Sequence, residues 1–408
     1  MGRAYLDHAS TSPLRPEART AMVQALTVVA GDPGRIHEEG LTARVALEAA
    51  REQVATLFGA RSREVVFTSG ATEAIAAAVW GAAERLRGRR ATSGDGDDAT
   101  AAPEHADATP APTGHQVVTA VEHSAVRLAA ERAGAVTVVP VDRRGRVAVD
   151  DVVAAVRPDT AAVHVQWGNH EVGTTQPVVE VVAACRELGV LVHVDAAQAA
   201  GRVPIAFDGL GADLLTISGH KLGGPAGTGA LLVRRGLRLP PLLVGGDQER
   251  ARRAGLEPVA ALVGLGAACA ALAAPAPTVP GSTVLDVEAA RAQRSTDRLR
   301  EGVSGIEGVE VYGDPRHRLP HLVCLGIGGV EPQGVLLGLD RAGVAAHSGS
   351  ACSSESLEPS PVLEAMGVDA DRSLRLSVGW STTDADIDRA IDALPATIGR
   401  LRALAAGA

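Results

Sequence analysis

The sequence predicts an α/β protein with a large, mainly parallel sheet and a smaller α+β part after it. Short apolar stretches alternate with amphipathic helical stretches from about residue 45 to 235, as in successive βαβ units. The chain has 408 residues, more than a usual single domain, so two domains with a sizeable core are expected. No uncharged apolar run of about 18 residues occurs, so a membrane-spanning helix is not expected.

The bulk composition is that of a soluble enzyme. Hydrophobic residues make up 46% of the chain, and the formal net charge of -9 gives no reason to expect direct nucleic-acid binding. Residues 1–8 contain no long apolar run, so no secretory signal is visible and a cytoplasmic location is expected. No two of the 12 histidines lie at helical spacing within a stretch that has the pattern of a helix, so no metal site is expected.

The first element with a chemical signature covers residues 64–75. It has the pattern of an apolar strand, a tight Ser-Gly-Ala-Thr turn at residues 69–72 and the start of a helix. Free backbone N–H groups and the helix dipole at such a turn can hold a phosphate group. Taken alone, the stretch could equally be an ordinary helix start with Ser69 or Thr72 as the capping residue.

The composition changes between residues 88 and 114. Alanine, aspartate, proline, threonine and glycine dominate there, and no apolar periodicity is present. Such a stretch cannot bury enough apolar surface to fold, so a disordered surface insertion is predicted. Regular strand character resumes at residues 116–121 and leads directly to His123.

Two later strands carry the most informative polar residues. An apolar strand at residues 190–194 runs into Asp195, and another at residues 214–217 is followed by Lys221, framed by small residues. An isolated lysine in a loop is usually a solvated surface charge. An acid at one strand end and a lysine after the next strand suit pyridoxal phosphate (PLP), whose aldehyde needs an amine of lowered pKa and whose ring nitrogen needs a carboxylate. Lys221 is therefore predicted to be a Schiff-base lysine.

The C-terminal part has the pattern of a smaller α+β domain. An alanine- and proline-rich passage at residues 270–280 lies near the expected boundary, and a helix with a polar face is expected at residues 286–302. Residues 322–326 have the pattern of a strand, and residues 384–405 that of terminal helices.

The four cysteines differ in their surroundings. No C-x-x-C pair is present, which argues against a disulfide framework or a zinc site. Cys185, Cys269 and Cys324 lie in apolar stretches and are predicted to be small core residues. Cys352 lies in a polar stretch of small residues at 347–356, where an exposed thiol is placed to react; the alternative is an incidental loop cysteine.

The order of these motifs is similar to that in the NifS/IscS-like cysteine desulfurases, which are PLP-dependent class V aminotransferases. The resemblance covers nearly the whole chain except the insertion, and it rests on residues 5–13, 67–73, 122–126, 171–173, 193–198, 218–221, 249–250 and 348–352. The lysine and phosphate-turn motifs are shared across class V, so they imply the cofactor. The Ser-Gly-Ser-Ala-Cys stretch at 348–352 implies desulfuration, because this cysteine loop is the part particular to desulfurases.

The resemblance implies how the cofactor is held. Lys221 would bond to the cofactor and then move the substrate α-proton, Asp195 would pair with the pyridinium nitrogen, and His123 would lie against the ring. The remaining cofactor contacts would come from Gln198 at the phenolic oxygen and from Thr72, Ser218, His220 and the backbone at Ala71 around the phosphate.

The resemblance also implies how L-cysteine is handled. Arg375 would receive the substrate carboxylate as a bidentate fork, although a surface arginine is the alternative. Cys352, as a thiolate, would attack the substrate sulfur and leave alanine and an enzyme persulfide. His347 could help to lower the pKa of this thiol, and its alternative is a solvated loop histidine.

Three positions depart from the family pattern. His170 replaces the asparagine that usually donates to the phenolic oxygen; an imidazole N–H can donate too, but its tautomer then matters. Leu256 replaces a threonine that usually reaches the phosphate of the neighbouring subunit, and leucine cannot make that hydrogen bond. Residues 31–35 replace the usual Gly-Asn-Pro-Ser-Ser pattern. The departures suggest a divergent member tuned to a particular sulfur acceptor.

The resemblance implies a PLP-dependent aminotransferase fold (fold type I) and a homodimer. We expect an N-terminal arm at residues 1–14 that packs with the small domain, a large PLP-binding domain at 15–265, and a small C-terminal domain at 266–408 that carries the cysteine loop. The acceptor could be an iron–sulfur scaffold, a tRNA-thiolation protein or a biosynthetic sulfur carrier. Two alternatives remain: another class V reaction, such as selenocysteine lysis or transamination, and a non-catalytic paralogue that acts as a binding subunit.

Overall fold

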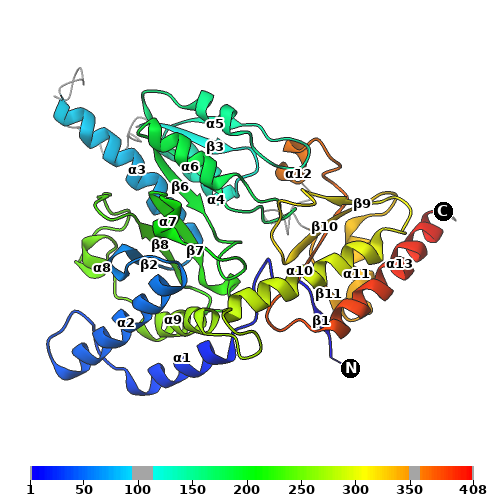
Figure 1. Ribbon diagram of the computed structural model, residues 1–408, viewed down its shortest axis with the longest axis horizontal. Coiled ribbons are helices and arrows are strands. Elements are labelled where there is room, and N and C mark those ends of the chain that lie inside the picture. The colour runs from blue at the N-terminus through cyan, green and yellow to red at the C-terminus, as the bar shows by residue number, and fades with distance from the viewer. Residues whose placement is uncertain (1, 94–113, 349–358, 407–408) are drawn as a thin grey trace, which may run out of the picture.

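A sheet of seven strands forms the centre of the molecule (Figure 1). The computed structural model describes residues 2–93, 114–348 and 359–406. The strands are β2 (Val65–Thr68), β3 (His115–Thr119), β4 (Ala135–Val139), β5 (Thr160–Gln166), β6 (Leu191–Asp195), β7 (Leu214–Ser218) and β8 (Gly229–Val233). Their order is β2-β8-β7-β6-β5-β3-β4, and every adjacent pair is parallel except the two pairs that β8 forms. The predicted α/β fold with a mainly parallel sheet is confirmed.

The central strands β2, β3, β5, β7 and β8 are buried along their whole length because both faces of the sheet are covered. Successive side chains of a strand point to opposite faces. In β2, Val65 and Phe67 join a core formed with α2 (Glu38–Leu57), α6 (Val178–Glu187) and α9 (Val259–Ala273). Val66 points the other way and packs with α3 (Ala71–Ser93). The predicted continuous apolar strands therefore belong to the middle layer of three.

The remaining helices of this part flank the sheet or connect its strands. They are α1 (Pro16–Val28), α4 (Ser124–Ala133), α5 (Val149–Ala155), α7 (Phe207–Leu210) and α8 (Gln248–Ala251), with short 3-10 turns η1 (Ser62–Glu64) and η2 (Gly219–Lys221). α1 packs against α9, and α4 packs against α3. Among the described residues, no helix has both the length and the apolar character needed to cross a membrane.

The boundary of the predicted insertion differs from the expectation. Helix α3 continues through residues 88–93, so the first residues of the stretch predicted to be disordered are helical. Their composition, which includes Arg89 and Ala91, is compatible with a helix, because arginine and alanine have high helix propensity. Residues 94–113 lie outside the described part of the chain.

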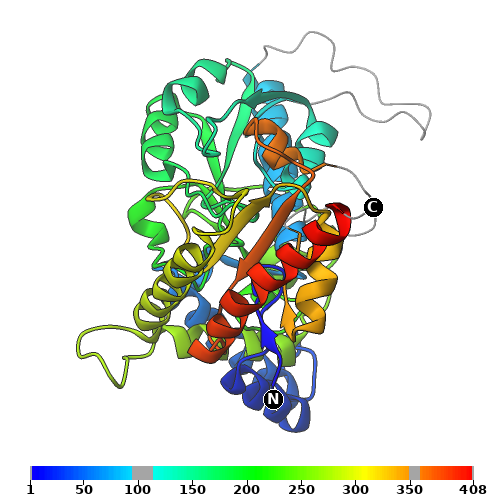
Figure 2. The same ribbon diagram turned by 90° about the vertical axis from the view of Figure 1, so that its right-hand side faces the viewer.

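The C-terminal part contains a second, antiparallel sheet. Its strands are β12 (Ser373–Ser377), β10 (Leu322–Ile327) and β9 (Val309–Tyr312), in that order. The helices beside it are α10 (Val284–Val303), α11 (Pro332–Arg341), α12 (Pro361–Ala365) and α13 (Asp384–Ala406). Figure 2 shows α10 and α13 lying across this sheet. The predicted terminal helices are one continuous helix, which includes Pro395.

The N-terminal residues pack against this C-terminal part. Strand β1 (Ala4–Tyr5) pairs in parallel with β11 (Val344–Ala345). Leu6 extends the contact: its N–H donates to Ala345 O, and its carbonyl accepts from Ser377 N–H. Ala4 and Leu6 are fully buried in the same apolar core as β10 and β12. Residues 4–6 thus carry Asp7 and the residues after it to the edge of the central sheet.

Candidate active site

A cavity of about 640 Å³ lies at the carboxyl ends of the central strands. Its lining combines segments that follow β2, β3, β5, β6 and β7 with residues of the N-terminal arm and of β12. Ligand sites of open α/β sheets form at this edge because the connections on either side of the switch point diverge there. The cavity is lined by all ten predicted site residues that the structure describes: Ala71, Thr72, His123, His170, Asp195, Gln198, Ser218, His220, Lys221 and Arg375. The eleventh, Cys352, lies outside the described residues.

The turn between β2 and α3 forms one wall of the cavity. Ala71 begins a helix of 23 residues, and the N–H groups of its first turn have no acceptor within the helix. Cβ atoms built on Gly70 and Gly227, which also line the cavity, would have no neighbour within 4 Å. Glycine at these two positions therefore keeps the space beside the helix start open. Together with Thr72, the helix start provides donors that suit an anion such as a phosphate group.

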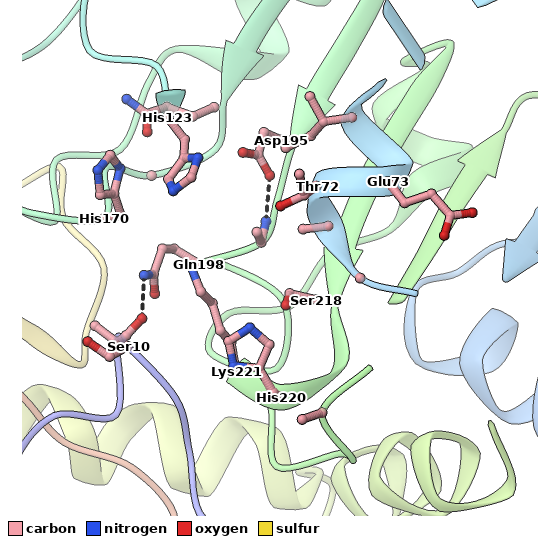
Figure 3. A pocket seen from close by; sticks show the side chains of 18 of the residues that line it. Ser10, Thr72, Glu73, His123, His170, Asp195, Gln198, Ser218, His220 and Lys221 are labelled. Carbon is pink, nitrogen blue, oxygen red and sulfur yellow. Dashed lines mark hydrogen bonds between the residues drawn. The ribbon is translucent and has the colours of Figure 1, made fainter. Parts of the chain in front are cut away.

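Glu73 also lines the cavity, and in Figure 3 its carboxylate points away from Lys221, His123 and His170. Its carboxylate forms an ion pair with Arg253 at 2.9 Å and accepts a hydrogen bond from Ser69 N–H at 2.9 Å. Arg253 belongs to the stretch that departs from the family pattern, and its pairing ties that stretch to the turn. Leu256, in the same stretch, is 62% exposed.

Lys221 ends the turn η2 directly after β7. A Cβ on Gly219 would lie 2.2 Å from Thr228 Oγ1, so the backbone before the lysine passes too close to β8 for any other residue. Arg202 donates to Lys221 O at 2.8 Å and fixes the end of this turn. Desolvation lowers the pKa of Lys221 to about 8, although the charge of Asp195 opposes the shift. Roughly a tenth of the amine is therefore neutral at pH 7, far more than for a lysine of ordinary pKa, and a neutral amine is nucleophilic.

Asp195 lies at the end of β6, as predicted, and is 6% exposed. Its Oδ1 accepts a hydrogen bond from Ala197 N–H at 3.0 Å, and burial raises the pKa of its carboxyl group. Gln198 follows on the same turn, and its Nε2 donates to Ala9 O at 2.8 Å. Both side chains face the cavity (Figure 3), so a ring placed between them would meet a carboxylate at one edge and an amide at another.

The rings of His123 and His170 lie together at one side of the cavity (Figure 3). Their centroids are 5.1 Å apart and the planes meet at 65°. Nδ1 of His123 accepts the N–H of Ala125, so the ring hydrogen is on Nε2. Desolvation, with smaller effects from His170 and Lys221, lowers the pKa of His123 to about 3. His123 is thus a neutral ring of fixed orientation, which suits contact with a flat cofactor.

Arg375 enters the cavity from β12 and is 1% exposed. Nη2 donates to Asp7 Oδ1 at 3.0 Å and to Ser10 Oγ at 2.7 Å, and Nη1 donates to His170 O at 2.8 Å. Its Nε is buried and has no hydrogen-bond partner among the described residues. The arginine is therefore held by its surroundings while part of its donor capacity remains unused. The alternative of a surface arginine is excluded.

His347 also lines the cavity. Its backbone exchanges two hydrogen bonds with Arg375, at 3.2 and 2.6 Å. Burial and the charge of Arg375 lower its pKa. His347 is half-buried at the edge of the cavity, and its role toward the Cys352 thiol stays a prediction. It precedes Ser348, the last described residue before Cys352.

Several residues of the site were not predicted. Asp7 and Ser10 accept hydrogen bonds from Arg375. Both lie in the stretch 5–13 that contributes to the resemblance, but no contact with Arg375 was predicted for them. Glu171 lies 3.4 Å from the His170 ring and accepts from Ser360. Glu249, one of the residues on which the resemblance rests, does not line the cavity and forms a buried ion pair with Arg51 instead.

The donor set of the cavity fits the chemical groups of PLP. Thr72, Ser218 and the start of α3 provide donors for a phosphate, Asp195 provides a carboxylate for a ring nitrogen, and Lys221 provides an amine of lowered pKa. Within residues 2–93, 114–348 and 359–406, no group of three histidine, cysteine or acidic side chains is arranged to hold a metal ion.

Comparison with known proteins gives consistent results. The profile of the family described as aminotransferase class-V matches residues 4–92 and 91–390. A protein named cysteine desulfurase IscS from Dictyoglomus turgidum is 38% identical over 98% of this chain and 95% of its own length. Among solved structures, a NifS-like protein superposes with a TM-score of 0.82 and 26% identity over 98% of this chain and all of its own. A structure described as SspA in complex with cysteine gives a TM-score of 0.73 and 27% identity, and the match covers 93% of this chain and 100% of SspA.

Proposed function

The chain belongs to the class-V aminotransferase family, among its cysteine desulfurases, and from this premise we propose that it removes sulfur from L-cysteine with Lys221 and Cys352 as its reacting side chains. The observation that carries the proposal is the convergence of Lys221, Asp195 and the start of α3 on one cavity. Its products are alanine and a persulfide on Cys352, from which an acceptor takes the sulfur.

PLP, the proposed cofactor, supplies an aldehyde that bonds to an amine and a ring that takes up electron density from the substrate. Thr72, Ser218, His220 and the N–H groups at Ala71 would hold its phosphate. Asp195 would bind the ring nitrogen, Gln198 and His170 would face the phenolic oxygen, and His123 would cover one face of the ring. The buried carboxylate of Asp195 and the neutral ring of His123 support these assignments.

Lys221 would both hold the cofactor and move the substrate α-proton. A general base works best when its pKa lies near the working pH, and desolvation lowers the pKa of this amine to about 8. Asp195 keeps a negative charge nearby, which limits the shift and preserves some of the protonated form. The amine can therefore both accept and return a proton near neutral pH.

Arg375 would bind the substrate carboxylate. The guanidinium is already oriented by Asp7, Ser10 and the carbonyl of His170, so little side-chain entropy is lost when a ligand binds. A substrate carboxylate in this position would hold the amino acid at one end while Lys221 acts at its α-carbon.

Cys352 would receive the sulfur. Its thiolate would form a bond to the substrate sulfur while the carbon–sulfur bond breaks, and a proton would replace the sulfur on the substrate carbon. The other three cysteines of the chain are buried. Burial raises the pKa of Cys185 to about 11 and that of Cys269 to about 12, and it also raises the pKa of Cys324. These three thiols are therefore poor candidates for the nucleophile.

Other features of the proposed enzyme stay predictions from the sequence. They are the homodimer, the division into an arm and two domains, the location in the cytoplasm, and a sulfur acceptor such as an iron–sulfur scaffold, a tRNA-thiolation protein or a biosynthetic carrier. A selenocysteine lyase, an aminotransferase or a non-catalytic binding subunit would each give a different result in the experiment below.

The test is the release of alanine from L-cysteine in the presence of PLP and a reductant. The wild-type protein should release alanine, Cys352→Ala should release none while it keeps the visible absorption of the bound cofactor, and Lys221→Ala should lose both. Equal release by the wild type and Cys352→Ala would mean a reaction that needs no persulfide. A wild type without visible absorption after PLP is supplied would favour the binding subunit.

A further inference from the structure

Lys221 is the only lysine in the chain. Of the 39 lysine and arginine side chains, all but this one are arginines, and an arginine stays protonated in a protein and does not react as an amine. The α-amino group at the start of the chain is the one other amine. A reagent that attacks amines therefore meets a single lysine in this protein, and that lysine lines the cavity.

The fold leaves the amine of Lys221 unused. Among the described residues, this amine forms no hydrogen bond and no ion pair, although Asp195 is close enough to influence its pKa. Desolvation is the largest effect on that pKa, and the charges of Arg375 and Arg202 also favour the neutral form. A neutral amine that borders a cavity can attack an electrophile that enters it.

The same cavity contains groups that attract a small anion. Thr72 and Ser218 line it, as Figure 3 shows, and the N–H groups in the first turn of α3 have no acceptor within the helix. Arg375 lines it too, and its buried Nε has no partner among the described residues. A small anion that also carries an electrophilic carbon would therefore be held in the space that Lys221 borders.

An acyl phosphate has both properties, because its phosphate is an anion and its carbonyl carbon is attacked by neutral amines. In this reaction the nitrogen of the amine forms a bond to the carbonyl carbon. The bond from that carbon to the phosphate oxygen breaks, inorganic phosphate leaves with the electron pair, and the amine gives one proton to the solvent. The product is an amide, which has lost both the positive charge and the nucleophilic character of the lysine.

We propose that Lys221 is the one lysine-acylation site of this protein, that acyl phosphates are the reagents that use it, and that acylation and PLP loading exclude each other. The part that concerns PLP rests on the proposed function, because it assumes that the cofactor bonds to Lys221. A molecule acylated at Lys221 can no longer bond the cofactor. The amount of active enzyme then depends on whether PLP or an acyl phosphate reaches Lys221 first.

The test treats the full-length protein with acetyl phosphate near neutral pH, with and without PLP, and locates acetyl groups by mass spectrometry after digestion. We expect an acetyl group on the peptide that contains Lys221 in the cofactor-free protein and none on it in the PLP-loaded protein. The N-terminal peptide should react equally in both. Equal acetylation of Lys221 with and without PLP would overturn the mutual exclusion, and an unreacted Lys221 in the cofactor-free protein would overturn the whole proposal.

Arg19→Lys provides a matched reference within the same molecule. Arg19 is exposed on α1 and does not line the cavity, so the introduced amine should have the pKa of an ordinary lysine. Because a lower pKa raises the neutral fraction, Lys221 of the cofactor-free protein should be acetylated about 10- to 100-fold faster than the introduced amine. Inorganic phosphate should slow the reaction at Lys221 alone. Equal rates at the two positions, or equal slowing by phosphate, would contradict the role of the cavity.

A second measurement separates this proposal from the proposed function. Acetylation of the cofactor-free protein before PLP is added should reduce the visible absorption of the bound cofactor in proportion to the acetylated fraction of Lys221. If the untreated protein shows no such absorption, the proposed function fails, and the labelling without PLP still decides whether Lys221 is the acylation site. If the protein releases alanine from L-cysteine while Lys221 of the cofactor-free form stays unreacted, only the present proposal fails.

Discussion

Arg51 and Arg375 are both almost completely buried, at 2% and 1% exposed, but their guanidinium groups are paired very differently. Arg51 Nη1 and Nη2 each bond one oxygen of Glu249, at 2.6 and 2.7 Å, and its group stacks 4.5 Å above the Phe67 ring. Arg375 bonds a single carboxylate oxygen, since Nη2 donates to Asp7 Oδ1 only. Its Nε has no partner among the described residues.

The difference distinguishes a structural arginine from one that can take a ligand. Arg51 also donates to Glu48 and to Val65 O, so its donors are used within the fold. It fixes Glu249, at the start of a turn in which Glu249, Arg250 and Ala251 all have left-handed backbone angles. Burial and charge are the same for the two arginines and do not tell their roles apart. What distinguishes Arg375 is that it lines a cavity and has donor capacity that the fold does not use.

The largest expected effect is on stability, at Arg51. Removal of one partner of a buried ion pair leaves the other charge uncompensated and costs about 3–5 kcal/mol. Arg51→Met should therefore lower the free energy of unfolding by that amount, measured by denaturant titration of the PLP-loaded protein. The exposed Arg19 on α1 provides the matched control, since Arg19→Met should change stability by less than about 0.5 kcal/mol. Equal losses of stability in the two variants would mean that the buried ion pair of Arg51 contributes no more than an exposed arginine does.

At Arg375 the expected effect is on substrate binding. Lysine keeps the charge but cannot copy the planar fork, so Arg375→Lys should raise KM for L-cysteine about 10- to 100-fold. The absorption of the bound cofactor should persist. The control is Arg372→Lys. Arg372 is exposed, precedes β12 directly and forms an ion pair with Asp369, so this change should leave KM unchanged. If Arg375→Lys lost stability as Arg51→Met does and kept its KM, Arg375 would be structural as well.

A buried histidine next to Asp7, the partner of Arg375, should make the stability of the protein depend on acid. On the side of Arg375, His8 is buried, and desolvation with nearby arginines lowers its pKa to about 3. The unfolded chain, with a histidine pKa of about 6.5, binds more protons below that pH, so the folded state loses stability as pH falls from about 6.5 towards 3. The loss from His8 should reach roughly 1–2 kcal/mol at about pH 5. His8→Asn should flatten the pH dependence of unfolding in this window, and an unchanged slope would mean that other groups cause it.

The smallest expected effect concerns Asp7. Asp7→Asn keeps a hydrogen-bond acceptor for Arg375 but removes the charge, so KM for L-cysteine should change by about 3- to 10-fold, or about 1 kcal/mol. Because Asp7 acts through Arg375, the change should disappear in a variant that already carries Arg375→Lys. A full effect of Asp7→Asn in that background would show that Asp7 touches the substrate or cofactor by another route.

The features that the sequence predicted best are those that depend on residues close together in the chain. Asp195 and Lys221 follow apolar strands directly, and the turn at residues 69–72 stands between a strand and a helix, so local pattern was enough to place all three at one sheet edge. The fold class followed from the same alternation of strands and helices. The buried ion pair of Glu249 was not predicted, because the direction of its side chain depends on a left-handed turn that the sequence does not signal.

The contacts between distant parts of the chain could not be predicted in this way. Asp7 and Arg375 are 368 positions apart, and Ser360 and Glu171 are 189 apart. No local pattern encodes such pairs, since they form only when β1 joins β11 and the C-terminal sheet packs beside the cavity. The continuation of α3 through residues 88–93 differs from the prediction for another reason, since a change in composition does not by itself end a helix.

The most direct test of the central claim is to locate the sulfur after a single turnover. The PLP-loaded protein would be mixed with L-cysteine without a reductant, digested and examined by mass spectrometry. We predict one additional sulfur atom on the peptide that contains Cys352, an equal amount of alanine, and no added sulfur on the peptides of Cys185, Cys269 or Cys324, whose thiols are buried. Alanine formation with no sulfur on Cys352 would contradict the account.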